Sequence, residues 1–245
     1  MSDRICEKQH VAVRNVTDYL RYFLADPTAF RGQQLRGGGP VAEFEQLLAE
    51  RCGFPFCVAT CNATTALLGL ALIIHARGRT VLFPRDHWEG SVAAFRLMGA
   101  KIRRYNPPRK QTDSVASDDP VVATIVGQSD DFKATRIHAS GLGRLVIEDS
   151  GRIPGISAAI GHESRSDIQV LSFGPGKPLC LGEGGAVLFR DERLYEQFVR
   201  STQHPERVAS EFGRPAKTPD VCLNGRIHPL AALIGIEFLR KNNPH

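Results

Sequence analysis

The sequence lacks the segments that mark membrane and secreted proteins. Its longest apolar run, ALLGLALII at residues 66–74, is less than half as long as the roughly 20 residues that span a bilayer. The N-terminal residues MSDRICEKQHVAV contain no apolar core of a secretory signal. From these absences we expect a cytoplasmic protein that has no membrane partner.

A strong charge of one sign is also lacking. Lys and Arg total 31 against 26 Asp and Glu, which leaves a formal net charge of only +5. The basic residues form no arginine-rich run, and no aromatic pattern of an RNA-binding sheet accompanies them. Such a dispersed excess is typical of a solvated surface, so we expect no nucleic-acid partner.

Cysteine is present without the spacing of a metal site or a disulfide framework. None of the six cysteines forms a CxxC pair, and no HxxxH partner follows the group at residues 52–61. Reduced and mostly buried thiols are therefore expected, with no bound metal. The cysteines are Cys6, Cys52, Cys57, Cys61, Cys180 and Cys222.

What the sequence does contain is an alternation of short apolar runs with helical patterns. With 245 residues and 42% hydrophobic content, the chain is long enough for one large domain with its own core. The alternation predicts an α/β fold with three layers, α/β/α, around a mainly parallel sheet. Strands are expected at 56–60, 80–84, 101–106, 121–127, 144–149, 167–173 and 185–190. Helices are expected at 40–51, 61–76, 88–99, 191–202 and 228–241, and the Pro- and charge-rich segment 203–222 is expected to be irregular.

Polar residues follow three of the expected strands. Asp149 ends one strand, Ser172 and the loop that carries Lys177 follow another, and a turn at residues 62–65 follows a third. Because the carboxyl ends of parallel strands meet at one edge of a sheet, an acid, a lysine and a helix N-terminus should lie at the same crevice.

This combination suits pyridoxal 5′-phosphate (PLP). A lysine on a stiff loop can form a Schiff base with the aldehyde, and Asp149 can supply the anion beside the pyridinium nitrogen. Asn62 is a candidate N-cap of the helix that follows the first strand. The helix start at Ala63 and Thr64 offers backbone N–H groups and a positive dipole end to phosphate. Ser172 and Thr64 add hydroxyl donors, and Trp88 lies just past a strand end, where its ring can stack on the cofactor. Each feature alone is weak, since strands often end in Asp and a lone Trp is more often a core residue; their order and convergence carry the interpretation.

At these residues the chain resembles the DegT/StrS-type sugar aminotransferases, which are PLP-dependent and have the aspartate-aminotransferase type of fold. The most specific stretch is SFGPGKPLCLGEGG at 172–185, where a Ser-Phe pair precedes the lysine and Glu-Gly-Gly follows it. The other matching stretches stand in the family's order at 37–50, 61–72, 81–100, 146–155 and 224–239.

The resemblance implies a role for each matching residue. Lys177 would be the Schiff-base lysine, Asp149 the pyridinium partner and Ser172 a phosphate ligand. The Ala63 amide and Thr64 would hold phosphate, and Trp88 would stack on the ring. Asn224 matches an asparagine that reaches the phosphate in the neighbouring subunit, which implies a homodimer with shared active sites.

The chain departs from the family pattern at four places. Ala63 stands where a glycine is usual, Gly225 stands where a tyrosine is expected, and Arg152 replaces a His or Gln near the pyridine hydroxyl. Arg152 could therefore contact the cofactor, bind a substrate anion or point outward. The sequence also stops at His245, so segment 203–245 is expected to lead toward a C-terminal small lobe that is truncated, while residues 1–40 form an N-terminal arm of a single domain.

The function implied is transfer of an amino group from an amino acid donor, Glu or Gln, to the keto group of a sugar or other small metabolite in a biosynthetic pathway. Two alternatives use the same residues. One is another PLP enzyme, such as a lyase, racemase or decarboxylase, and the other is a degenerate, partner-dependent protein without transaminase activity.

Overall fold

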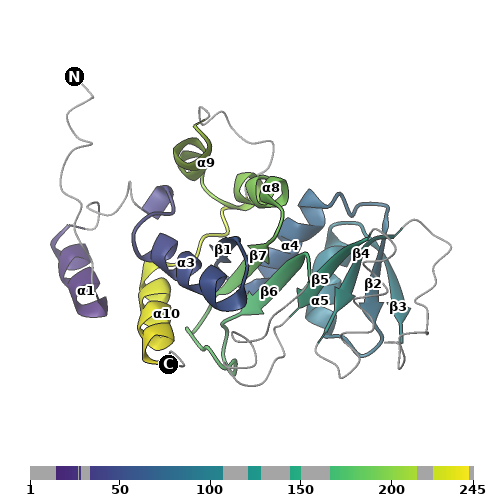
Figure 1. Cartoon of the computed structure of the whole chain (residues 1–245), viewed down its shortest axis with the longest axis horizontal. Coiled ribbons are helices and arrows are strands. Elements are labelled where there is room, and N and C mark those ends of the chain that lie inside the picture. Colours follow the sequence, from purple (N-terminus) through teal and green to yellow (C-terminus); the bar gives the residue numbers. More distant parts are fainter. Residues whose placement is uncertain are drawn as a thin grey trace.

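The computed structural model of the chain describes residues 15–26, 28, 34–106, 121–127, 144–149, 166–213 and 223–242. Helices and strands alternate through these residues (Figure 1). The strands are β1 (Phe56–Thr60), β2 (Thr80–Pro84), β3 (Lys101–Tyr105), β4 (Val121–Val126), β5 (Leu145–Asp149), β6 (Ile168–Ser172) and β7 (Gly185–Phe189). The helices are α1 (Val16–Ala25), α3 (Pro40–Cys52), α4 (Ala63–Ile73), α5 (Glu89–Leu97), α8 (Glu192–Thr202), α9 (Pro205–Phe212) and α10 (Pro229–Lys241). Within these residues, none of the helices combines the length and the apolar character that crossing a membrane requires.

The described strands form one seven-stranded sheet in the order β1-β7-β6-β5-β4-β2-β3. Strands β3, β2, β4, β5 and β6 pair in parallel. Strand β7 is antiparallel to both of its neighbours, β6 and β1, so β1 runs in the same direction as the parallel strands. The carboxyl ends of these six strands therefore lie at one edge of the sheet, where β7 begins.

Helices cover both faces of the sheet, as Figure 1 shows. On one face α4, α5 and α8 bury a core that includes Leu70, Phe95 and Phe198. On the other face α3 and α10 pack over β1, β7 and β6, with Phe44 and Ile236 in the core. The predicted α/β architecture with a mainly parallel sheet is confirmed.

Local sequence signals account for the helix ends. Helix α3 begins at Pro40, where the missing N–H costs nothing, and ends at Gly53, whose φ of 67° is the left-handed conformation that glycine favours. Helix α4 begins after Asn62, whose side-chain oxygen accepts a hydrogen bond from the Thr65 amide. Both starts agree with the sequence prediction.

The prediction that residues 203–222 are irregular is wrong in its first half. Helix α9 occupies Pro205–Phe212, with the His204 side chain accepting from the Glu206 amide at its start and Gly213 in the left-handed conformation at its end. Pro205 stands at the first position of the helix, where proline is favoured rather than disruptive. The charged residues that suggested a loop belong to a short helix that buries only a narrow face. Residues 214–222 lie outside the described part of the chain.

The division of the chain into an N-terminal arm, one large domain and a C-terminal remnant stays a prediction. Within the described residues, α1 packs on α10 through Tyr19 and Leu233. Helix α10 in turn packs on α3, where a Cβ at Gly235 would lie 2.4 Å from the Phe44 ring. The N-terminal and C-terminal helices are thus neighbours on one face of the sheet (Figure 1).

Candidate active site

The residues predicted to bind PLP gather at the carboxyl edge of the sheet. Asp149 is the last residue of β5 and stands opposite Val170 of β6. Ser172 is the last residue of β6 and stands opposite Gly185, the first residue of β7, which is in turn opposite Thr60 of β1. This edge of the sheet therefore brings Asp149, Ser172 and Thr60 together, although these residues are far apart in the sequence.

The N-terminus of α4 supplies a cradle of backbone donors. Asn62 accepts the Thr65 amide through its side chain at 2.8 Å and the Ala66 amide through its carbonyl at 3.2 Å. Within the described residues, no acceptor is found for the amides of Ala63 and Thr64. These two N–H groups and the positive end of the helix are what an anionic group such as phosphate requires.

A glycine lets this helix press against the sheet. A Cβ at Gly185 would lie 2.6 Å from the Ala63 nitrogen and 2.7 Å from the Asn62 carbonyl carbon, both backbone atoms that cannot turn aside. Ser172 pairs with Gly185 across the strands. The predicted phosphate ligands Ala63 and Ser172 therefore both lie next to Gly185.

Lys177 lies on a loop that is tied to the core at both ends. The Phe173 amide donates to the Gly184 carbonyl and the Phe173 carbonyl accepts from the Leu181 amide, each at 2.9 Å. Leu181 is buried with Phe173 in the core under α3 and α10. Gly176, directly before the lysine, has a φ of 78°, so a residue without Cβ is needed there. The half-buried lysine is thus presented on a fixed turn between β6 and β7.

Asp149 is buried, and two side chains contact the same oxygen of its carboxylate. Ser91 Oγ donates to Asp149 Oδ2 at 2.6 Å, and His87 Nε2 lies 3.0 Å from the same Oδ2. Both side chains come from the beginning of α5: Ser91 from its first turn, and His87 from just before it. The sequence reasoning missed His87 and Ser91, although both lie within a few residues of Trp88 in a stretch that it had singled out.

Trp88 precedes the first residue of α5 and is 65% exposed. A Cβ at Gly90 would meet its indole at 2.4 Å, so the ring lies over this glycine rather than in the core. Trp88 is therefore not part of the core. Its position next to His87, which contacts Asp149, is compatible with the stacking role, which stays a prediction.

Asn224 lies on a segment beside the cradle. The Gly225 carbonyl accepts from the Cys61 amide at 2.8 Å, and Asn224, exposed and with a φ of 49°, accepts from Arg226 Nε at 3.0 Å. A Cβ at Gly225 would lie 2.4 Å from the Thr65 methyl group, so a tyrosine at this position would require the Thr65 side chain to move. Whether Asn224 reaches a neighbouring subunit stays a prediction. Arg152 lies outside the described residues.

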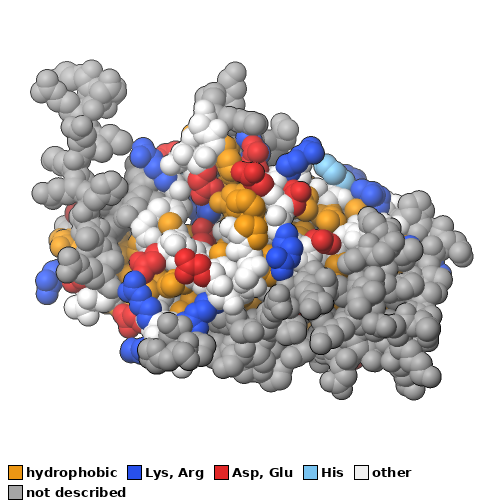
Figure 2. Space-filling view, in the orientation of Figure 1, with side chains coloured by type: hydrophobic (Ala, Val, Ile, Leu, Met, Phe, Trp, Pro, Cys, Tyr) orange, Lys and Arg blue, Asp and Glu red, His pale blue; other side chains and the backbone are white. Residues whose placement is uncertain are grey.

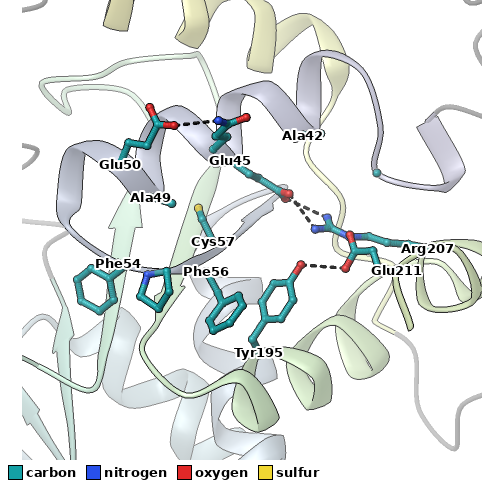
Figure 3. Close-up of a pocket in the computed structure, with 13 residues that line it drawn as sticks. Ala42, Glu45, Ala49, Glu50, Phe54, Phe56, Cys57, Tyr195, Arg207 and Glu211 are labelled. Atoms are coloured by element: carbon teal, nitrogen blue, oxygen red, sulfur yellow. Dashed lines mark hydrogen bonds and ion pairs between the residues drawn. The ribbon is translucent and has the colours of Figure 1, made fainter. Parts of the chain in front are cut away.

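Two of the cavities lined by described residues differ in their relation to this site. One, of about 350 Å³, is lined by Cys61, Glu183 and Arg226 among others and so adjoins the cradle. The other, of about 440 Å³, lies between α3, α8 and α9 at the opposite end of β1 (Figure 3). The charged side chains of Glu45, Arg207 and Glu211, which line this second cavity, face one another. We interpret these three residues as a structural cluster.

Within that cluster, Arg207 donates hydrogen bonds of 2.9 and 2.8 Å to the two carboxylate oxygens of Glu45, and its Nε donates to Glu211 at 2.8 Å. Burial alone would lower the pKa of Arg207, but the two carboxylates outweigh burial and raise it above its ordinary value. Over the face that carries α3, α8 and α9, acidic and basic side chains are interspersed (Figure 2).

The comparison with known families agrees with the geometry at the carboxyl edge. The model of the DegT/DnrJ/EryC1/StrS aminotransferase family matches residues 27–104 and 120–243. The chain belongs to this family. The predicted family and its cofactor, PLP, are thereby confirmed.

Similar proteins from this family act on nucleotide-linked sugars. The chain is 32% identical over 218 residues to dTDP-3-amino-3,6-dideoxy-alpha-D-galactopyranose transaminase from Aneurinibacillus thermoaerophilus, covering 80% of this chain and 56% of that protein. It is 29% identical over 181 residues to UDP-2-acetamido-2-deoxy-3-oxo-D-glucuronate aminotransferase from Pseudomonas aeruginosa, covering 68% of this chain and 50% of that protein. The chain thus spans half to six-tenths of the length of the curated relatives it matches.

Solved structures show the same fold. The aminotransferase from Psychrobacter cryohalolentis superposes with a TM-score of 0.71 at 19% identity, over 92% of this chain and 61% of that one. Helicobacter pylori PseC superposes with a TM-score of 0.68 at 18% identity, over 94% of this chain and 63% of that one. The chain therefore shares the fold of these aminotransferase structures.

Proposed function

We propose that the chain carries the cofactor site of a PLP-dependent aminotransferase that moves an amino group from an amino acid donor, glutamate or glutamine, to the keto group of a nucleotide-linked sugar. The observation that carries the proposal is the convergence of Asp149, the open α4 N-terminus and the Lys177 loop at one sheet edge. The sugar substrates of the similar transaminases support the acceptor class.

The described residues fit the cofactor. The amides of Ala63 and Thr64 and the hydroxyl of Ser172 would bind the phosphate, aided by the dipole of α4. The carboxylate of Asp149, already contacted by two side chains, would hold a proton on the ring nitrogen. When bound, PLP supplies an electron sink for the bond that breaks at the substrate carbon.

Lys177 has two tasks in this scheme. Its Nζ would hold the cofactor covalently, and as a free amine the same nitrogen would act as general acid/base, taking a proton from the substrate carbon and giving it back in the reverse half-reaction. A fixed loop suits this work because the amine must return to the same place in each half of the reaction. Trp88 would lie against the cofactor ring.

We further propose a cytoplasmic homodimer in which Asn224 contributes to the neighbour's site. The exposed position of Asn224 beside its own cradle supports this arrangement. The side chains of Ile234 on α10 and Leu20 on α1 are also exposed and would gain cover in a dimer. Light scattering of the purified protein, with and without PLP, tests the oligomeric state.

The experiment that tests the function is a PLP titration followed by a donor screen. The wild-type protein should develop a visible absorbance band that borohydride removes, and Lys177→Ala should lose that band while keeping its circular dichroism spectrum. Glutamate or glutamine should then convert the cofactor to pyridoxamine phosphate. A band without donor-dependent conversion would indicate a lyase, racemase or decarboxylase, and no band would indicate a degenerate site.

A further inference from the structure

Asp149 is held by side chains to which the sequence comparison had given no role. Ser91 Oγ and His87 Nε2 both meet the single oxygen Oδ2, at 2.6 and 3.0 Å. The side chain of His87 is only 3% exposed and that of Asp149 only 8%. Two polar contacts on one oxygen restrict the rotation of the carboxylate about its Cβ–Cγ bond more than a single contact would.

The histidine ring itself lies close to two further segments. Its ring lies 5.5 Å from the ring of Phe83, a fully buried residue of β2. A Cβ at Gly127, directly after β4, would come within 3.2 Å of Nδ1 and 3.6 Å of Cε1 of the same ring. Segments from β2, β4 and β5 therefore meet at this imidazole, and only Nε2 is directed at the carboxylate.

We infer that His87, with Ser91, is a positioning residue for the PLP ring: it donates from Nε2 to Asp149 and so holds the carboxylate ionised and oriented toward the ring nitrogen. This inference rests on the proposed PLP site and adds a new residue to it. A serine hydroxyl and an imidazole N–H both donate, and a carboxylate that receives two donors in a buried site is favoured in its ionised form. A neutral imidazole can serve only as the tautomer with hydrogen on Nε2.

The same helix start has a second consequence. Trp88, predicted to lie against the face of the ring, stands between His87 and Ser91 in the sequence and precedes α5 directly. The start of α5 would then set both the plane of the ring, through Trp88, and the anion at its nitrogen, through the two donors. A shift of this one turn would disturb both contacts at once.

Three variants separate donation from packing. His87→Phe keeps a planar ring of similar size against Phe83 but removes the donor, and His87→Gln keeps a donor near the position of Nε2. Gly127→Ala keeps the histidine but places a methyl group close to its Nδ1. The probes are PLP and its analogue with C–H in place of the ring nitrogen, each titrated by absorbance against wild type and variants.

We expect His87→Phe to weaken PLP binding about tenfold or more, because it removes a hydrogen bond to a charged group. The PLP affinity of His87→Gln should stay within about threefold of wild type, and that of Gly127→Ala should fall between the two. The carbon analogue has no ring nitrogen for Asp149 to pair with, so its affinity should be the same in wild type and His87→Phe. Equal losses for both probes would show a purely structural role and would overturn the inference, as would unchanged PLP binding in His87→Phe.

A second measurement does not depend on PLP. The ¹⁵N chemical shifts of the His87 ring in the cofactor-free wild-type protein should show a proton on Nε2. A neutral ring protonated only on Nδ1 would overturn the inference. This measurement uses only the wild-type protein, so it tests the inference even if His87→Phe does not fold. If wild type binds no PLP, the proposed function fails by itself, while the ring shifts still report whether His87 donates to Asp149.

Discussion

Gly185 stands against the backbone of Ala63 so closely that no larger residue fits between them. A Cβ at Gly185 would lie 2.6 Å from the Ala63 nitrogen. The contact places the first turn of α4, with its donor amides, directly on the edge of the sheet next to Ser172. A glycine that the sequence shows only as part of a Glu-Gly-Gly motif thus determines where the proposed phosphate cradle lies.

Gly185→Ala should push the N-terminus of α4 away from the sheet. We expect the free energy of unfolding to fall by about 1–3 kcal/mol, as for other overpacked cores, and PLP affinity to fall further than stability alone explains. Urea denaturation and PLP titration measure the two effects. Gly174→Ala is the matched control, because a Cβ there would meet its nearest neighbours at 3.9 and 4.0 Å, an ordinary contact distance; equal behaviour of the two variants would refute the close-approach account.

Glu45→Ala should be among the most destabilising single changes in the described part of the chain. It leaves the buried guanidinium of Arg207 with Glu211 as its remaining carboxylate and also removes the acceptor of the Ala59 amide. Breaking a buried ion pair from one side costs about 3–5 kcal/mol. The exposed Glu50 on the same helix is the control, and Glu50→Ala should change stability by no more than about 0.5 kcal/mol. Comparable losses in the two variants, measured by urea denaturation, would argue against the cluster as a structural anchor.

Alkaline pH should weaken the fold through buried thiols. Burial raises the pKa of Cys52 to about 12, so the folded protein keeps this proton at a pH at which the unfolded chain has lost it. The unfolded state then binds fewer protons, and stability falls as pH rises from about 9 toward 12, by about 1.4 kcal/mol per pH unit for one thiol. Urea denaturation of cofactor-free protein between about pH 9 and about pH 10.5 should show a smaller decrease in the free energy of unfolding for Cys52→Ala than for wild type. Parallel losses would show that the Cys52 thiol is not the group responsible.

The exposure of the thiols also predicts the order in which the cysteines react with an alkylating reagent. Cys180 is exposed and Cys61 half-buried, whereas Cys52 and Cys57 are buried, and burial raises the pKa of the Cys57 thiol well above its ordinary value. Among these four cysteines, brief alkylation near neutral pH, mapped by peptide mass spectrometry, should label Cys180 first and leave Cys52 and Cys57 unlabelled until the protein is unfolded. Early labelling of Cys57 would contradict the packing of α3 on β1.

The sequence predicted the strands and the site edge well because both depend on local patterns. Apolar runs with β-branched residues mark β4 and β5, and the polar residue that ends each run marks the carboxyl edge, so Asp149 and Ser172 were found without a structure. Asn62 and Pro40 were recognised as helix starts because capping is a short-range interaction. The same reasoning failed at α9, which buries only Val208 and one charged residue, Arg207. Arg207 looks like a surface residue until its partner Glu45 is known.

His87 and Ser91 were missed for a similar reason. A buried histidine becomes meaningful only when its partner is in place, and Asp149 is 62 residues away in the sequence. The need for glycine at positions 185 and 225 was equally invisible, because the atoms that exclude a side chain belong to α4. Contacts across the chain, rather than spacing along it, determine these features.

The most direct test of the account is to identify the residue that holds the cofactor. The protein is loaded with PLP, reduced with borohydride, digested and analysed by mass spectrometry. The account predicts a reduced pyridoxyl group on Lys177 and its absence in Lys177→Ala. A pyridoxyl group on another lysine, or none on a folded wild-type protein, would contradict it.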